Sequence, residues 1–253
     1  MQEDVGQRVL RASEDIRASG DGAGIPLRLV GSYAVRMHCP AHAEFLDRLQ
    51  RETVNDLDFV SERKFARDIQ RIFESLGYVG DKRLEQASDG QQRYFVHPET
   101  RLGVDVYLGS MNYCHPIDME GRLESDPTTV PLAELLLSKL QIVELTEKDI
   151  KDVLVLLLAH DVGPGDTGSI NVDRIADVLA HDWGFHHTVT TNLATIEQHL
   201  PEYPVLTDEE RVTVGDRIDR LRRRIEAEPK DRRWKLRAKV GTRVRWYQAV
   251  EEK

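Results

Sequence analysis

Residues 55–60 have the sequence Asn55-Asp56-Leu57-Asp58-Phe59-Val60, in which acidic and apolar side chains alternate. Because successive side chains of a β-strand point to opposite faces, this pattern predicts a strand whose two carboxylates share one face. At a rise of about 3.3 Å per residue, Asp56 and Asp58 would then lie about 7 Å apart. Carboxylates this close repel each other unless cations lie between them, so the segment predicts a site for hard divalent ions. A polar edge strand that faces water is the alternative.

A second predicted strand, residues 103–108, carries one isolated carboxylate, Asp105, between Val104 and Val106. Aspartate is unfavourable inside a strand, and a partly buried charge needs a partner. Three such carboxylates on two strands therefore predict a shared metal site better than three independent exceptions do.

The short apolar segment 27–30, predicted to be a strand, ends in Gly31-Ser32, and residues 33–38 are predicted to be a helix that Ser32 caps. A glycine at such a turn lets a ligand approach the backbone, and a helix N-terminus favours negative charge. Gly31 and Ser32 are therefore candidates for contacting a phosphate. A simple helix cap is the alternative.

Lys139 lies within the apolar stripe of a helix predicted from Pro131 to Glu144. A lysine on a packing face needs an anionic partner, which a nucleotide phosphate or a site carboxylate would supply. Extension of its long stem to solvent is the alternative. In the next predicted helix, Asp149 is expected to form a capping box with Thr146. Asp152 would either line the edge of a cleft or be solvated in the first turn.

The predicted elements indicate an α+β protein. Residues 1–128 would form a small mixed β-sheet with flanking helices, in the order αβαβαββ, and residues 129–253 a mostly helical domain. Residues 161–171 contain three glycines and a proline and are expected to be a linker. The glycine-rich loop within it lacks the lysine and the spacing of a phosphate-binding P-loop, so we interpret it as a hinge.

Composition limits the class of protein. The contents of 40% hydrophobic and 31% charged residues are typical of soluble globular proteins. The longest apolar run, Val153 to Ala159, is far shorter than the ~18 residues that span a bilayer, so we expect no membrane partner. The acidic start, Met-Gln-Glu-Asp, predicts no secretory signal, and a cytoplasmic location is expected. Cys39 and Cys114 are too few for a disulfide framework or a structural zinc site, and we expect His115, His186 and His187 to be packing or surface residues.

Charge is distributed unevenly along the chain. The net charge is −9, yet residues 211–245 contain 14 Lys and Arg against 5 Asp and Glu, a local charge of +9 that leaves −18 for the rest. Such a segment commonly faces a polyanion, although a pair of solvated amphipathic helices is the alternative. Within it, the basic stretch from Arg220 to Lys239, with Trp234 interleaved, could hold RNA by phosphate contacts and stacking. The candidate residues are Arg222, Arg223, Arg224, Arg232, Arg233 and Lys235.

Together, Gly31-Ser32 after a strand, Asp56-Leu57-Asp58 and the later Asp105 resemble the signature of the nucleotidyltransferase superfamily. Residues 135–141, followed by Lys148-Asp149 and Asp152, look more narrowly like the abortive-infection and type IV toxin branch. The resemblance covers about residues 27–160. Ser32 and Asp56 are 24 positions apart (56 − 32), about twice the usual family spacing, so residues 39–52 are expected to loop out as an insertion.

The resemblance implies transfer of an NMP group from an NTP to a hydroxyl acceptor, with Mg²⁺ or Mn²⁺ as cofactor. Asp56 and Asp58 would hold the ion that bridges the triphosphate. Asp105 would help to hold a second ion and could act as the general base. The nucleotide contacts would come from Gly31, Ser32, Lys139 and Asp152.

The acceptor is open at this level. The toxin branch implies tRNA or another RNA as acceptor and an antitoxin protein as a partner. An aminoglycoside-type transferase for small molecules and a transferase that modifies proteins are alternatives within the same class. A catalytically idle member that binds RNA or a protein is the alternative outside it.

Overall fold

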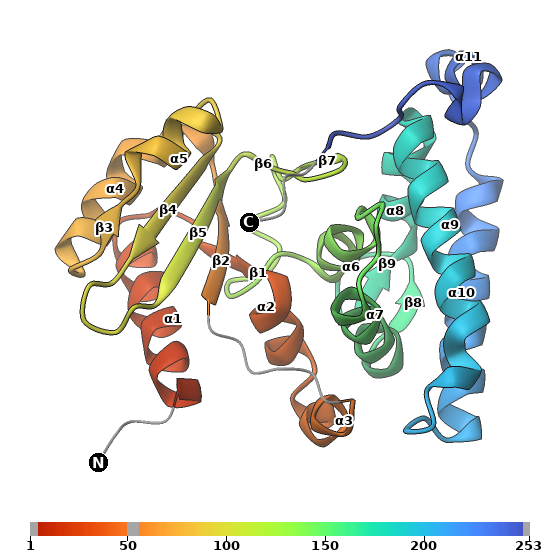
Figure 1. Ribbon diagram of the computed structural model, residues 1–253, viewed down its shortest axis with the longest axis horizontal. Coiled ribbons are helices and arrows are strands. Elements are labelled where there is room, and N and C mark those ends of the chain that lie inside the picture. The colour runs from red at the N-terminus through yellow and green to blue at the C-terminus, as the bar shows by residue number, and fades with distance from the viewer. Residues whose placement is uncertain (1–4, 50–55, 250–253) are drawn as a thin grey trace. The chain divides into compact units, whose positions relative to one another are not determined.

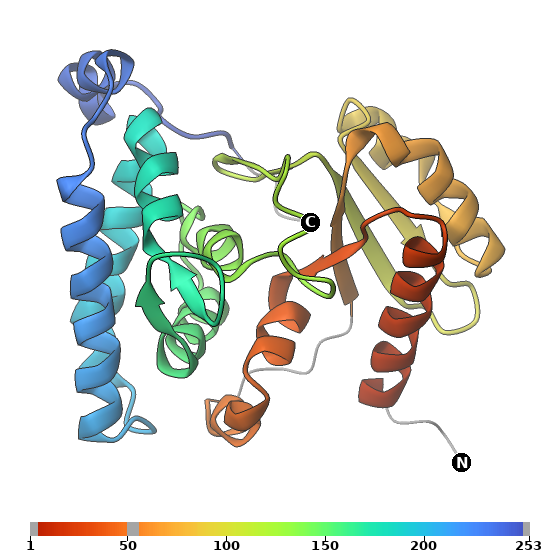
Figure 2. The ribbon, with the colours of Figure 1, turned by 180° about the vertical axis from the view of Figure 1, so that it is seen from behind.

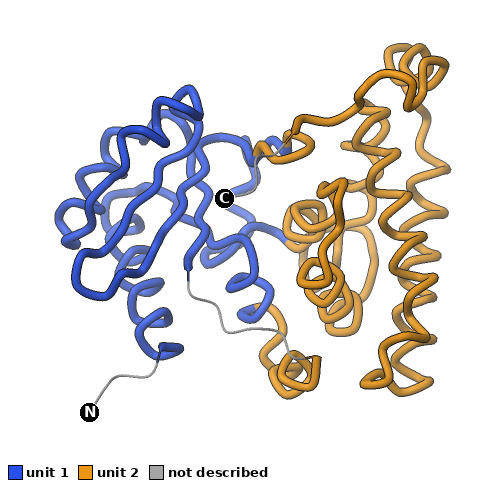
Figure 3. Tube along the Cα trace, in the orientation of Figure 1, with its two compact units in different colours: residues 1–37, 52–111, 117–131 blue, residues 38–51, 112–116, 132–253 orange. Residues whose placement is uncertain are grey.

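The computed structural model describes residues 5–49 and 56–249 (Figure 1). The chain divides into two compact units (Figure 3). Unit 1 comprises residues 1–37, 52–111 and 117–131, and unit 2 comprises residues 38–51, 112–116 and 132–253. The predicted α+β class is confirmed, with a mixed sheet in the N-terminal half and a mostly helical C-terminal half. None of the helices in the described residues is long and apolar enough to cross a bilayer.

Unit 1 is built on a five-stranded sheet with the strand order β1-β2-β5-β4-β3. The strands are β1 (Arg28–Val30), β2 (Asp56–Ser61), β3 (Val79–Gly80), β4 (Gln92–Val96) and β5 (Gly103–Leu108). The central strands β2 and β5 are parallel, and the other neighbours are antiparallel. The strands predicted over residues 27–30, 55–60 and 103–108 match β1, β2 and β5, although Asn55 lies outside the described residues. Strand β3 is too short for its sequence to show an alternating pattern.

The helices of unit 1 are α1 (Val5–Gly22), α2 (Gly31–His38), η2 (Arg63–Phe65), α4 (Ala66–Ser75) and α5 (Lys82–Ala87). The core lies between the sheet and the pair α1 and α4. Helix α1 packs against α4 and β2, and Phe73 of α4 stacks on Phe95 of β4 with ring centroids 4.0 Å apart. Leu57 and Phe59 are fully buried on the same face, so the apolar half of the alternating pattern forms the core. The acidic half is therefore directed to the other face.

The edge of the sheet beside β1 is covered by the last segment of unit 1, which follows β6 (Ser110–Asn112) and β7 (Pro116–Asp118). The amide of Leu29 donates to the carbonyl of Thr128, and the amide of Val130 donates to the carbonyl of Leu29, both at 2.9 Å. Pairing of this kind satisfies an edge strand that would otherwise expose its backbone.

Unit 2 is mostly helical. Its helices are η1 (Pro40–His42), α3 (Ala43–Arg48), α6 (Leu132–Leu140), α7 (Glu147–Ala159), α8 (Val172–His181), α9 (Trp183–His199), η3 (Leu200–Glu202), α10 (Asp208–Ala227), α11 (Arg232–Val240) and η4 (Gly241–Arg243). Thr146 caps α7 as predicted, since its hydroxyl accepts from the amide of Asp149 at 3.3 Å. Helix α6 ends at Leu140, before the predicted Glu144. The side-chain amide of Asn192 donates to the carbonyls of Leu140 and Ile142 and so satisfies the C-terminal end of α6.

Two predictions about connecting segments are wrong. The linker expected over residues 161–171 contains a parallel pair of short strands, β8 (Asp161–Gly163) and β9 (Ser169–Asn171), visible side by side in Figure 2. Gly165 and Gly168 have positive φ angles, which lets residues 164–168 turn back over so short a distance. The described part of the expected insertion does not loop out either. It forms η1 and α3, whose Phe45 and Leu46 are buried in unit 2.

Candidate active site

The two central strands place the three aspartates on one face of the sheet. Asp58 of β2 and Asp105 of β5 are direct partners in the parallel register, and Asp56 is the partner of Gly103. Neighbouring strands lie about 4.8 Å apart, so the Asp58 and Asp105 side chains start from adjacent positions. Asp56 is exposed, whereas Asp58 and Asp105 are half-buried. A polar edge strand is excluded for β2, because it is flanked by β1 and β5.

The turn after β1 lies directly against this pair. Gly31 has a φ of +72°, and a Cβ atom at this position would collide with the Oδ2 atom of Asp58. Only glycine therefore fits between the turn and the carboxylate. Helix α2 begins at Gly31, two residues earlier than predicted, so Ser32 lies inside its first turn rather than at its cap. Despite the long interval in sequence, the structure brings Gly31 and Asp58 together.

The carboxylates of this face have the chemistry of a Mg²⁺ or Mn²⁺ site, because both ions prefer oxygen ligands. As placed, they do not surround a common point. Across residues 5–49 and 56–249, no group of three or more His, Cys, Asp or Glu side chains is arranged to hold a metal ion. The Oδ1 atom of Asp105 instead accepts a hydrogen bond from the side-chain amide of Gln92. The donor set and its shared face fit the ion, and side-chain rotation would be needed to converge on it.

Lys139 and Asp152 form a second cluster, within unit 2. The Lys139 ammonium lies 2.8 Å from a carboxylate oxygen of Asp152 and 3.6 Å from one of Asp149. The Lys139 side chain is 12% exposed and that of Asp152 is 2% exposed. Lys139 therefore has the anionic partner that its position required, and its stem does not extend to solvent. The alternative that Asp152 is solvated in the first turn is wrong.

Cys39 also lies in unit 2, in surroundings that disfavour its thiolate form. Its sulfur is 3.9 Å from the carbonyl oxygen of Val155 and 3.9 Å from the Nε2 atom of His160. Burial, followed by the negative charge of Asp152, raises the pKa of the Cys39 thiol to about 12. Burial also lowers the pKa of His160, so this imidazole is poorly suited to accept the thiol proton.

His115 is a packing residue, in agreement with the prediction. Its ring stacks on Phe185 with centroids 5.0 Å apart, and its Nε2 atom lies 2.8 Å from the hydroxyl of Thr188. Burial lowers the pKa of His115 to about 4, so the ring is neutral at physiological pH.

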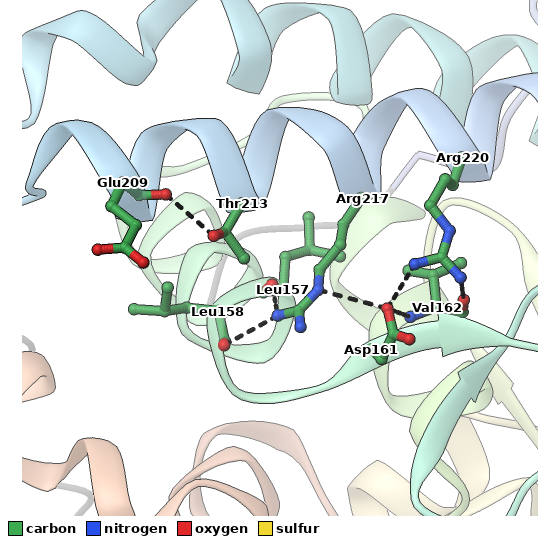
Figure 4. Close-up of polar contacts among 8 residues, drawn as sticks. All are labelled: Leu157, Leu158, Asp161, Val162, Glu209, Thr213, Arg217 and Arg220. Atoms are coloured by element: carbon green, nitrogen blue, oxygen red, sulfur yellow. Dashed lines mark hydrogen bonds and ion pairs between the residues drawn. The ribbon is translucent and has the colours of Figure 1, made fainter.

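Arginines of α10 tie this helix to the end of α7 and to β8 (Figure 4). Arg217 donates to the carbonyls of Leu157 and Leu158 at 2.7 and 2.9 Å, where the helix leaves its last carbonyls without partners. Arg220 lies 2.5 Å from the carboxylate of Asp161. These cations stabilise unit 2 and are only partly available to a polyanion.

The six candidate RNA contacts divide into two groups. Arg222, Arg223 and Arg224 of α10 form ion pairs with acidic side chains of unit 2; the shortest are with Glu197 at 2.8 Å, Asp219 at 3.2 Å and Asp173 at 2.5 Å, respectively.

Arg232, Arg233 and Lys235 of α11 are exposed, and residues 232–249 contain no Asp or Glu. Trp234 is half-buried, edge-on to His186 with ring centroids 5.1 Å apart, so it is not fully available for base stacking.

Comparison with protein-family models, with curated proteins and with solved structures finds no match to this chain. The assignment of these residues therefore rests on the sequence pattern and on the geometry within each unit. Two side chains on the aspartate face, Gln92 and Tyr94, were not predicted from the sequence. No local signal marks them, because β4 does not alternate: the charged Arg93 lies between them, and Phe95 and Val96 are both apolar.

Proposed function

We propose that this protein is a metal-dependent nucleotidyltransferase that moves an NMP group from an NTP to a hydroxyl acceptor. One observation carries the proposal: Asp58 and Asp105 are adjacent on parallel strands, with the Gly31 turn directly against Asp58. A backbone turn that begins a helix favours a phosphate, and adjacent carboxylates favour a hard cation. Phosphoryl-transfer chemistry needs both features in one place.

The residues of unit 1 would act as follows. Asp56, Asp58 and Asp105 hold Mg²⁺ or Mn²⁺, which when bound neutralises phosphate charge. The backbone at Gly31 and the hydroxyl of Ser32 hold phosphate oxygens. The acceptor hydroxyl attacks the α-phosphorus, its proton passes to the carboxylate of Asp105, and the bond from the α-phosphorus to the bridging oxygen of the pyrophosphate group breaks.

Lys139 and Asp152 would contribute to nucleotide binding in this proposal. A lysine held by a buried carboxylate keeps its side chain in one orientation, so less conformational entropy is lost when a phosphate binds. The family resemblance assigns nucleotide contacts to both residues. Their structural pairing is independent of that assignment.

An acceptor screen tests the proposal. The full chain is incubated with each labelled NTP and Mg²⁺ or Mn²⁺, first with total tRNA, then with hydroxylated small molecules, then with proteins. We expect one acceptor class to become labelled, with pyrophosphate released in equal amount, and Asp58→Asn to abolish labelling. Asp216→Asn, at an exposed position of α10, is the matched control. Labelling that survives Asp58→Asn contradicts the proposal. The proposal also fails if no acceptor is labelled and calorimetry detects no binding of Mg²⁺-NTP, and this second outcome favours a catalytically idle binding protein.

The exposed cations of α11 favour RNA as the acceptor. If RNA binds there, its affinity falls steeply with salt concentration, because phosphate contacts release counterions. Replacing Arg232 and Arg233 by glutamine should reduce that slope. An affinity that does not change with salt would exclude RNA and leave a small-molecule or protein acceptor. Whether an antitoxin protein binds the chain can be tested on the same variants.

A further inference from the structure

Strand β4 directs two polar side chains to the face that carries the aspartates. Tyr94 is the register partner of Asp105 in the antiparallel pair β4–β5, and Gln92 precedes it by two residues. Because residues two apart on a strand share a face, Gln92, Tyr94 and Asp105 all belong to the aspartate face. Both β4 residues are half-buried. This face therefore has a third strand of functional groups beside β2 and β5.

Gln92 contacts Asp105 directly. Its side-chain amide donates to the Oδ1 atom of Asp105. The backbone of Gln92 forms two hydrogen bonds with the hydroxyl of Ser88, each at 3.2 Å. The backbone N–H of Gln92 donates to this hydroxyl, and the backbone carbonyl of Gln92 accepts from it. The donor that orients Asp105 thus comes from a fixed point of the backbone.

Tyr94 reaches across β5 at Gly103. A Cβ atom on Gly103 would lie 2.7 Å from the Tyr94 hydroxyl and 3.3 Å from its ring, so the absence of a side chain there makes room for the tyrosine. Gly103 is the register partner of Asp56, which brings the hydroxyl into the row between the two strands. The Tyr94 hydroxyl therefore lies above Gly103, beside the position of Asp105 on β5 and that of Asp56 on β2.

We propose that Gln92 and Tyr94 are positioning residues of the cation site: Gln92 orients Asp105 so that one oxygen faces the ion, and Tyr94 occupies the row between Asp56 and Asp105. This inference rests on the proposed function, because it assumes that these aspartates hold a divalent cation. A ligand held by an outer partner binds its metal more tightly, and loss of such a partner weakens metal affinity about 10- to 100-fold.

Mn²⁺ binding to the full chain, followed by the electron paramagnetic resonance signal of the free ion, tests the inference without any activity assay. We expect Gln92→Ala to weaken Mn²⁺ binding at least about tenfold. Tyr94→Phe keeps the ring over Gly103 and removes only the hydroxyl, and it should weaken binding by a smaller factor. Gln92→Met keeps the length of the side chain and removes only the amide, so it should weaken Mn²⁺ binding as Gln92→Ala does, whereas a role in packing alone would leave its affinity at the wild-type value.

Matched controls separate the site from the rest of unit 1. Gln70→Ala removes a glutamine that donates to Glu74 at 2.8 Å on α4, and Tyr78→Phe removes the hydroxyl of a buried tyrosine packed edge-on against Phe73. Both should bind Mn²⁺ as wild type does. Circular dichroism verifies that each variant is folded; if Gln92→Ala is not folded, Gln92→Met decides.

The outcomes are distinguishable. If the wild-type protein does not bind Mn²⁺, or if Asp58→Asn binds Mn²⁺ as well as wild type does, the cation site of the proposed function is refuted. If Asp58→Asn removes binding but the Gln92 and Tyr94 variants match wild type or bind more tightly, only the positioning role is overturned. If the Gln92 and Tyr94 variants bind Mn²⁺ more weakly while the controls Gln70→Ala and Tyr78→Phe bind as wild type does, the positioning role is supported.

Discussion

The Lys139–Asp152 pair allows a test that separates its structural role from its proposed role in nucleotide binding. Asp152→Asn keeps the shape of the side chain and removes its charge, which leaves the Lys139 ammonium without its nearest partner at 2.8 Å. Lys139→Met removes the opposite charge and keeps a long apolar stem. The double variant removes both charges together.

The expected magnitude follows from burial. Removing one partner of a buried ion pair lowers the free energy of unfolding by about 3–5 kcal/mol, because an uncompensated charge remains inside. Lys139 is 12% exposed and retains Asp149 at 3.6 Å, so we expect Asp152→Asn to lie at the lower end, about 3 kcal/mol. The double variant should lose less than the sum of the two single variants, with a coupling energy of about 1–3 kcal/mol.

Tryptophan fluorescence during urea unfolding is the suitable measurement, because the three tryptophans of the chain, Trp183, Trp234 and Trp246, belong to unit 2. The signal therefore reports the unit that contains the pair. Lys151→Met is the matched control on the same helix. It breaks a 2.8 Å pair with Glu147, whose side chain is 70% exposed, and a pair of this kind contributes about 0–1 kcal/mol.

Two results would refute the reasoning. A loss below about 1 kcal/mol for Asp152→Asn would mean that the charge is not buried in solution. Additive losses in the double variant would mean that the two charges do not interact. If the double variant is folded and coupled, its affinity for Mg²⁺-NTP by calorimetry then reports the proposed nucleotide contact alone, and an affinity equal to wild type would remove Lys139 and Asp152 from the nucleotide site.

Three further predictions concern single residues. Gly31→Ala should lower the free energy of unfolding by about 1–3 kcal/mol, measured by thermal unfolding, and should also impair Mn²⁺ binding, because it strains the backbone and displaces Asp58; unchanged values for both would contradict the packing of this turn. Burial lowers the pKa of His115 to about 4 in the folded protein, against about 6.5 for an unperturbed imidazole. The unfolded state therefore binds more protons as pH falls, and stability should decline by about 3 kcal/mol between about pH 6.5 and 4. His115→Gln should reduce that pH dependence, and an unaltered profile would exclude His115 as its source. Cys39 should resist a thiol-specific reagent at pH 8 in the folded protein and react after unfolding, since it is buried and its pKa is about 12; fast labelling of the folded chain at Cys39, with Cys39→Ser as the control, would refute this.

The alternating pattern predicted the strands of unit 1 well because their local sequence carries the information. Leu57 and Phe59, which alternate with the aspartates, are buried, Asp56 is exposed, and β2 packs against α1. The register was not predictable in the same way. Asp58 becomes the partner of Asp105 through a connection of more than forty residues, and no local property of either strand fixes that alignment.

The insertion and the linker show a second limit. Residues 39–52 are polar on average, yet Phe45 and Leu46 are sufficient to bury α3 in unit 2. The glycines of residues 161–171 predicted a loop correctly for residues 164–168. The three-residue strands on either side are stabilised by each other, and neither is long enough to show a pattern of its own.

Charge shows most clearly what the sequence lacks. Counting residues found a strongly basic segment but could not distinguish Arg224, which lies 2.5 Å from Asp173 some fifty positions earlier, from Arg232, which is exposed. The fold supplies acidic partners to α10 and leaves α11 as the basic surface. Asp152 shows the same dependence on tertiary contacts. Its position in the helix allowed it to be either solvated or beside a cleft, and in the structure it is the buried partner of Lys139. Residue type and spacing therefore identify which groups carry the chemistry, whereas the pairing that sets their charge and orientation depends on contacts between distant parts of the chain.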